Sequence, residues 1–416
     1  MPRLLQRLSP VLALFFLAPL VGEFFLGDFP IVTIFLVAVF APMYGGAALL
    51  IREFTRRGGR GWPTIILLGL AYGVFEEGLV TQSLFNPHYL DQNLLDQGHG
   101  VLWLVYVVSL HTYWSVSVPV ALVEEATPAR RIRPWLGWKG LTVVAVLFVV
   151  GSFAVYNTNL QLNHNWMASG PQRLGTVAAV LVLVAVAFLL PKPAPADEYG
   201  AIGERGAHGQ HSATHERGAT GQRGATGQRG ATGQRGATGQ RGATGQRNAP
   251  HERGPARGDR MTWDIGAPEE TDATEQTNAT EGNGRAGNSV GALSRGGVPS
   301  GWVTGTVALV GGLIFKAGLI MPVWSAAVAA FLVGPAIVLV LTARWSRRVG
   351  WGPEQRLGIA GGTLLTYSWA AFTAHSASFA IDLVSHVIYA LAAIGLLYWV
   401  ARKMRTPDVA PDVSEG

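Results

Sequence analysis

Ten apolar runs, each about as long as a membrane-spanning helix, constrain this chain more than any other feature of its sequence. They lie near residues 10–26, 30–51, 63–82, 101–123, 138–157, 174–191, 302–320, 323–342, 357–376 and 380–401. A helix needs about 20 residues to cross about 30 Å of hydrocarbon, because each residue adds 1.5 Å along its axis. Within a single chain, only helices or a closed barrel satisfy the backbone hydrogen bonds in lipid. The runs therefore predict an all-α, polytopic transmembrane helix bundle with these ten spans.

The composition agrees with a membrane protein and excludes several kinds of site. Only 14% of the residues are charged, against about 25% in an ordinary soluble protein. There is no cysteine, which excludes disulfides, thiolate metal sites and cysteine nucleophiles. The net charge is +6, but the basic residues stand beside the ends of the apolar runs, which is typical of membrane topology. We expect the lipid bilayer as the main partner and no nucleic-acid partner.

The basic loops fix the expected orientation. Lys and Arg cluster after the second, fourth, eighth and tenth runs, whereas residues 83–100 contain neither. Basic loops face the cytoplasm, so ten spans place both termini there. The arginine-rich composition suggests a bacterial origin, and the expected location is the inner (plasma) membrane, crossed many times.

The spans fall into two blocks. Residues 1–191 form a block of six helices, and residues 301–405 form a block of four. Between them, residues 192–300 contain perfect Gly-Ala-Thr-Gly-Gln-Arg repeats from Gly218 to Arg247, a composition typical of a disordered, cytoplasmic linker. Residues 406–416 are expected to form a disordered tail.

Ionisable residues inside spans are costly and are therefore the first candidates for function. Glu76 and Glu77 are adjacent carboxyl groups in the third run, and His111 lies near the middle of the fourth. Asp382 and His386 are spaced i,i+4 on one face of the last run. The topology puts Glu76, His111 and His386 at similar depths, in the middle or outer half of the bilayer. We predict Glu76, Glu77 and His111 as catalytic residues, and His111 and His386 as ligands of a divalent metal such as zinc.

The remaining polar residues near span ends are interpreted one by one. Glu23 and His375, near the outer ends of their spans, lie at a depth where they could join the same layer. Lys316 is expected to extend to the outer interface. Glu124 and Glu125 end the fourth span beside arginines, and we interpret them as a solvated flank.

The Glu-Glu pair with a single histidine in the next span resembles the CAAX-processing and bacteriocin-processing (CPBP) family of intramembrane proteases. The motifs of that family are Glu-Glu-x-x-x-Arg, Phe-x-x-x-His and His-x-x-x-Asn/Asp. The resemblance implies that Glu76 activates water, Glu77 orients it and His111 is the histidine of the second motif. It covers residues 63–123. Here Thr81 replaces the arginine, Val107 replaces the phenylalanine, and no histidine is followed four residues later by Asn or Asp.

Three functions remain open at this point. The first is an active or degenerate intramembrane hydrolase of a peptide or small-molecule substrate. The second is a transporter in which Glu76, Glu77 and His111 relay protons or cations. The third is a membrane scaffold or accessory subunit whose polar residues only tie helices together. The stretch also resembles uncharacterised bacterial multi-pass membrane proteins.

Overall fold

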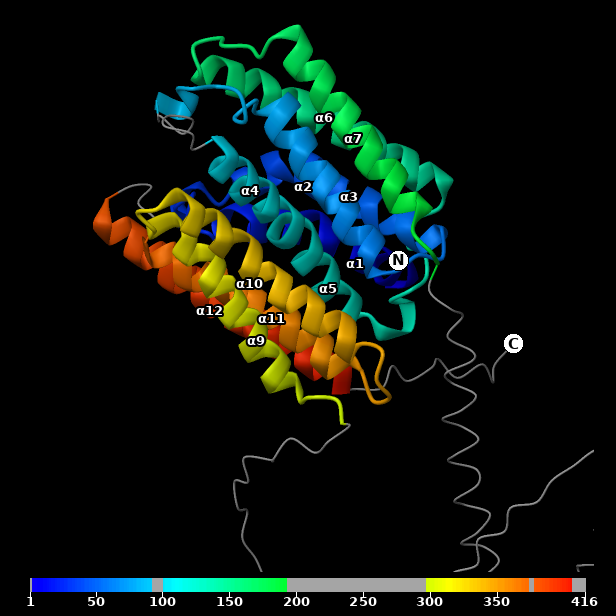
Figure 1. Cartoon of the computed structure of the whole chain (residues 1–416). Coiled ribbons are helices and arrows are strands. Elements are labelled where there is room, and N and C mark those ends of the chain that lie inside the picture. Colours follow the sequence, from blue (N-terminus) through cyan, green and yellow to red (C-terminus); the bar gives the residue numbers. More distant parts are fainter. Residues whose placement is uncertain (1, 92–99, 193–296, 374–377, 406–416) are drawn as a thin grey trace, which may run out of the picture. The chain divides into compact units, whose positions relative to one another are not determined.

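The computed structural model describes residues 2–91, 100–192, 297–373 and 378–405, and all the regular structure in these ranges is helical. Nearly all of the predicted linker, the predicted tail and His375 lie outside the described residues. The predicted all-α architecture is confirmed (Figure 1).

The first block contains long helices at each of its six predicted runs. Three of them continue into or through a π-helical turn, a wider turn in which an N–H bonds to the carbonyl five residues back. The elements are α1 (Pro2–Pro19) with η1 (Leu20–Phe24), α2 (Leu36–Arg57), α3 (Trp62–Phe75) with η3 (Glu76–Val80), α4 (Gly100–Leu110) with η6 (His111–Ser117) and α5 (Val118–Ala126), α6 (Trp138–Leu162) and α7 (Gly170–Leu189).

The second block contains a helix at each of its four predicted runs. They are α9 (Gly301–Ala317), α10 (Trp324–Trp345), α11 (Pro353–Ala370) and α12 (Phe379–Arg405). Paired glycines let these helices pack closely: a Cβ on Gly312 would lie 2.2 Å from Thr366 Oγ1, and one on Gly362 would lie 2.1 Å from the carbonyl oxygen of Gly305.

Eight of the described helices are long and apolar enough to cross a membrane. The first and ninth predicted runs also form helices, but the apolar helix Leu8–Phe24 is shorter and α11 does not reach the same hydropathy. Helix α11 is an inner helix whose Gly361, Leu364 and Tyr367 are buried against protein, so it needs less apolar surface than a helix that faces lipid. The polytopic bundle is established, and the count of ten spans remains a prediction.

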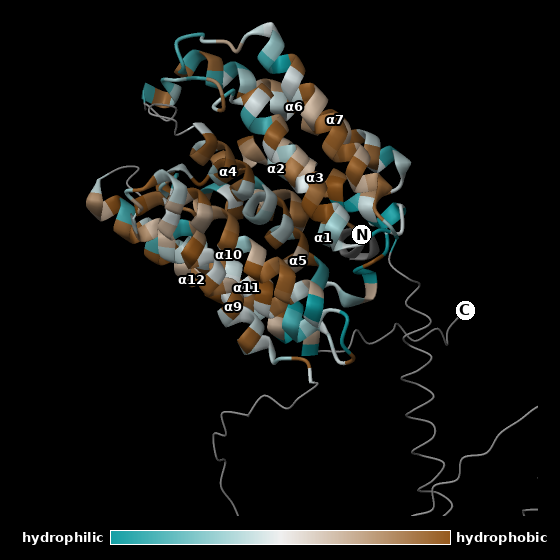
Figure 2. Ribbon diagram, in the orientation of Figure 1, coloured by the Kyte–Doolittle hydropathy of each residue, from teal (hydrophilic) through white to brown (hydrophobic). Residues whose placement is uncertain are grey.

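The helices form an inner and an outer group. More than half of the apolar window is buried in α2 (56%) and in α3 with η3 (61%), whereas α7 buries 11% and α10 22%. The outer helices expose large apolar side chains along their length, and Figure 2 shows hydrophilic residues gathered toward helix ends and loops. The outer group therefore presents the lipid-facing surface, and the inner group carries most of the buried ionisable residues of the described chain.

Polar contacts join the two blocks. The indole Nε1 of Trp114 donates to the carbonyl of Thr363 (2.7 Å), and the Tyr389 hydroxyl donates to the carbonyl of Phe29 (3.2 Å). The backbone N–H of Ile31 donates to Ser385 Oγ (2.9 Å). The second block thus packs directly on η6 and on the segment that follows η1.

The expectation that Glu124 and Glu125 form a solvated flank was wrong. Both are about 1% exposed, because helix ends from the two blocks close over them. Glu124 accepts from Arg56 Nε (2.8 Å) and Nη2 (2.6 Å), and Glu125 accepts from Arg356 Nε (2.5 Å) and Nη2 (3.1 Å). The two carboxylates are the centre of a buried ion-pair cluster that links α2, α5 and α11.

The interpretation of Lys316 also needs correction. Its Nζ donates to the Tyr106 hydroxyl at 2.7 Å and lies 5.0 Å from the centroid of that ring. The same ammonium group lies 5.7 Å from the ring of Tyr367. Lys316 therefore points into the contact between the blocks, where aromatic rings and hydrogen bonding replace part of its hydration.

Candidate functional site

The three π-helical turns in the described residues each carry an ionisable side chain of one cluster. Turn η1 contains Glu23, η3 contains Glu76 and Glu77, and η6 contains His111. The wider turns are visible in the backbone, where Phe25 N–H donates to Leu20 O (3.0 Å) and Thr81 N–H donates to Glu76 O (2.8 Å). Such turns are rare and occur often at functional sites.

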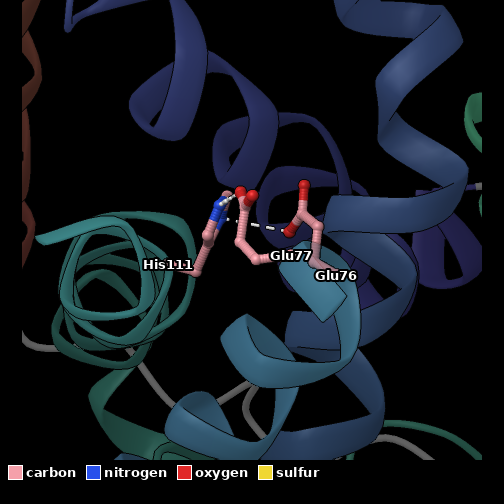
Figure 3. A group of neighbouring side chains, drawn as sticks. All are labelled: Glu76, Glu77 and His111. Carbon is pink, nitrogen blue, oxygen red and sulfur yellow. Dashed lines mark hydrogen bonds and ion pairs between the residues drawn. The ribbon is translucent and has the colours of Figure 1, made fainter. Parts of the chain in front are cut away.

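Glu76, Glu77 and His111 meet side by side between η3 and η6 (Figure 3). His111 Nε2 lies 2.7 Å from Glu77 Oε1, and His111 Nδ1 lies 3.1 Å from Glu76 Oε2. All three residues are at most 6% exposed. The two adjacent carboxyl groups therefore face opposite nitrogens of one imidazole.

Tyr44 extends this site to a third carboxyl group. Its hydroxyl contacts Glu76 Oε1 at 2.5 Å and also contacts Glu23 Oε1. A hydroxyl carries one proton and can donate it to only one acceptor. Tyr44 can therefore donate to only one of the two carboxyl groups at a time.

Glu77 is held from the other side. Its Oε2 accepts from Thr81 Oγ1 (2.9 Å) and from Ser83 Oγ, which itself accepts from Trp103 Nε1 (2.9 Å). With His111 on Oε1, both carboxylate oxygens of Glu77 are occupied. Charge-assisted hydrogen bonds of this kind fix the orientation of a carboxylate.

Glu76 is less constrained. Its Oε2 is buried and makes no hydrogen bond with any of the residues that the structure describes, although it faces His111. The ring of the buried Tyr72 lies 6.0 Å from the His111 ring. A buried oxygen without a donor is costly, so a further hydrogen-bond donor at Glu76 Oε2 would be stabilising.

Two glycines allow the helices to approach closely at the site. A Cβ on Gly73 would lie 3.0 Å from the Val108 carbonyl oxygen and 3.2 Å from His111 Cβ. A Cβ on Gly22 would lie 2.8 Å from Ser115 Oγ, and that hydroxyl is 3.2 Å from His111 Nδ1. Helix α3 and turn η1 can therefore lie this close to η6 because these positions have no side chain.

The site has the donors of a metal centre. One oxygen each from Glu76 and Glu77 and one nitrogen from His111 lie within 4.8 Å of one another. Carboxylate oxygens and imidazole nitrogens are zinc ligands, and three protein ligands with one open position are typical of catalytic zinc sites. The donor set therefore fits such an ion in type and in number.

His386 does not join this group. It is buried, but its ring lies 5.7 Å from Phe372, and its Nε2 would be 2.8 Å from a Cβ on Gly27. The metal-compatible group found among the described residues contains His111 without His386. The structure therefore brings three of the four predicted site residues together and places the fourth, on α12, beside Gly27 and Phe372.

The sequence reasoning missed several members of the site. Tyr44, Ser83 and Trp103 carry no charge and gave no signal inside or beside apolar runs. Glu23 was recognised only by its depth. In the structure the Tyr44 hydroxyl bridges Glu23 and Glu76.

Comparison with known proteins gives one match. Residues 12–196 match the model of a family described as an uncharacterised membrane protein family. That stretch includes Glu76, Glu77 and His111. A search of curated proteins and a search of solved structures found no match. Together with the apolar helices, the match identifies a multi-pass membrane protein whose first block is similar to this family.

Proposed function

We propose that Glu76, Glu77 and His111 form the centre of an intramembrane hydrolase that resembles the CPBP proteases. The observation that supports this is the convergence of the three side chains within 4.8 Å on two π-helical turns. The matched family has no described activity, so the proposal depends on the geometry and on the resemblance of the motifs.

Each residue has a role in this reaction. Glu76 Oε2, which lacks a hydrogen bond, accepts a proton from water as the water oxygen bonds to the substrate carbonyl carbon. His111, whose Nδ1 lies beside Glu76 Oε2, stabilises the negative charge as it passes from the Glu76 carboxylate to the substrate oxygen. The proton then passes to the leaving group as its bond to the carbonyl carbon breaks, so that water is added overall. Glu77, held by Thr81 and Ser83, orients the imidazole.

A divalent metal such as zinc would be held by Glu76, Glu77 and His111. When bound, it would polarise the carbonyl and lower the pKa of its water.

The test uses full-length protein in detergent. Metal content by elemental analysis and cleavage of a panel of fluorogenic transmembrane peptides are compared in wild type, Glu76→Gln and His111→Ala. We expect both variants to lose cleavage by at least about a hundredfold, the usual contribution of a positioned acid or base. Glu354→Gln, an exposed carboxyl group at the start of α11, is the control and should retain activity. Unchanged cleavage in Glu76→Gln would refute the proposal.

A second candidate function has its own observation. Glu23, Tyr44, Glu76, His111 and Glu77 form a continuous line of contacts across four helical segments, which is the arrangement of a proton relay in a transporter. Glu23→Gln separates the two functions. In proteoliposomes with a pH gradient it should abolish proton-coupled uptake, whereas the hydrolase does not need Glu23 for its chemical step. If every variant changes only the stability, a scaffold function is the better account.

A further inference from the structure

We infer that a cavity between the two blocks binds one acyl chain of an anionic phospholipid, with the headgroup at the arginine cluster around Glu124 and Glu125. The cavity has a volume of about 210 Å³ and lies between α3, η6 and α5 of the first block and α9, α10 and α11 of the second. It contains none of Glu76, Glu77 and His111 and is separate from the proposed hydrolytic centre.

The walls of the cavity suit a hydrocarbon chain. They are formed mainly by apolar and aromatic side chains from both blocks, among them Trp114, Phe315, Leu339 and Ile359. Helix α10 is apolar enough to lie in the membrane, and α11 packs inside the bundle. A chain from the surrounding lipid can enter such a space without leaving an apolar environment.

The polar lining gathers at one end of the cavity. Thr342 and Ser346 lie at the end of α10, and Arg356 lies in the first turn of α11. Trp351, in the connection between them, also lines this end. Tryptophan and arginine at this depth are typical of the headgroup level of a bilayer. The cavity therefore runs from an apolar interior to a polar mouth.

Arg356 connects the mouth of the cavity to an ion-pair cluster in which arginines outnumber glutamates. The ion pairs of the cluster involve three glutamates, Glu53, Glu124 and Glu125, and five arginines, Arg52, Arg56, Arg57, Arg131 and Arg356. Glu125 faces both Arg356 and Arg131, whose Nη1 is 3.7 Å away. The set contains two more arginines than glutamates, and basic pockets between helices bind anionic headgroups.

An anionic phospholipid matches both the apolar walls and the arginine-containing mouth of the cavity, which a zwitterionic lipid or an apolar molecule does not. A zwitterionic lipid would bring a second positive charge to a site that already has an excess. An apolar molecule without a headgroup would leave the arginines and the two hydroxyls unused.

Two pairs of variants of the full-length protein test the inference by native mass spectrometry, with phosphatidylglycerol and phosphatidylcholine as probes. Leu339→Trp fills the cavity, and Leu332→Trp places the same side chain on the exposed face of the same helix. Arg131→Gln removes a charge of the cluster that contains the lining residue Arg356, and Arg347→Gln removes an exposed charge outside the ion pairs of the cluster.

We expect the wild type to retain phosphatidylglycerol in preference to phosphatidylcholine. Leu339→Trp should lose that bound lipid, and Arg131→Gln should weaken its binding about fivefold, as expected for one surface arginine. Leu332→Trp and Arg347→Gln should bind as the wild type does. Equal retention of the two lipids, or equal binding within each pair of variants, would overturn the inference. If Leu339→Trp does not fold, the comparison of Arg131→Gln with Arg347→Gln decides alone.

Discussion

At the scale of single residues, Tyr44 connects Glu23 to the site formed by Glu76, Glu77 and His111. Its hydroxyl contacts both Glu23 and Glu76, and replacing Tyr44 by phenylalanine removes both contacts without changing any charge. Tyr44→Phe should lower the free energy of unfolding by about 1–3 kcal/mol, because buried carboxyl oxygens lose their partner. Thermal unfolding in detergent measures this effect.

Tyr156→Phe provides the control for that measurement. Within the part of the chain that the structure describes, the hydrogen bond of the Tyr156 hydroxyl is to the Met167 sulfur, at 3.7 Å, so its loss should change stability by less than about 0.5 kcal/mol. Equal destabilisation by the two substitutions would show that Tyr44 contributes no special contact.

The buried arginine cluster leads to a second prediction at this scale. Glu124→Gln removes the carboxylate that pairs with Arg56 and Arg52, and it leaves the buried guanidinium of Arg56 without its carboxylate while Arg52 keeps Glu53. We expect a loss of about 3–5 kcal/mol, the usual cost of breaking a buried pair. Asp91→Asn disrupts the exposed pair with His164 and should cost at most about 1 kcal/mol. Similar melting temperatures for the two variants would contradict the prediction.

Single residues differ in how far the sequence reveals them. Glu76, Glu77 and His111 were found because a charge within an apolar run is costly, and this is visible without a structure. Glu124 was misread because a carboxylate at a helix end is equally compatible with water and with a buried partner. The outcome was decided by α11, which brings Arg356 across from a part of the chain more than 200 residues away.

At the scale of elements, the helices followed from the length of the apolar runs, but the π-helical turns did not. The run 101–123 predicted one helix, and the structure contains α4, η6 and α5 in succession. No residue type specifies a π-helical turn, because it depends on which side chains must face a neighbouring helix. The residues that carry the proposed chemistry thus occupy the least predictable part of their helices.

The close approach of α3 to η6 gives a prediction for these elements. Gly73→Val would place side-chain atoms against the Val108 carbonyl and His111, separate the two helices and disturb the contact between His111 and Glu77. We expect a destabilisation of about 1–3 kcal/mol, as for other overpacked positions. The measurement is chemical or thermal unfolding in detergent.

Gly175→Val is the matched control in another membrane helix of the same block. A Cβ at Gly175 would meet nothing within 4 Å, so this variant should fold with stability close to that of the wild type. If Gly73→Val were tolerated equally well, the packing of α3 on η6 would be looser than the structure indicates.

At the scale of the whole molecule, the sequence indicated two groups of apolar helices but not how they pack. The pairing of α5 with α11, and of the segment after η1 with α12, depends on complementary surfaces that no single run displays. The orientation of the bundle in the membrane, unlike its packing, was predicted from the sequence of the loops alone. Arg347 lies in a basic loop, and His164 lies in the connection between α6 and α7, expected on the other side.

The chain contains no cysteine, so any cysteine introduced into it is the single labelling site. His164→Cys, at a side chain that is 81% exposed, should react with a membrane-impermeant maleimide added to intact cells. Arg347→Cys, at another exposed position, should react only after the cells are lysed, because basic loops remain in the cytoplasm. Labelling of both in lysed cells is the control for reactivity. The reverse pattern in intact cells would invert the bundle and move the arginine cluster, with its proposed lipid site, to the outer leaflet.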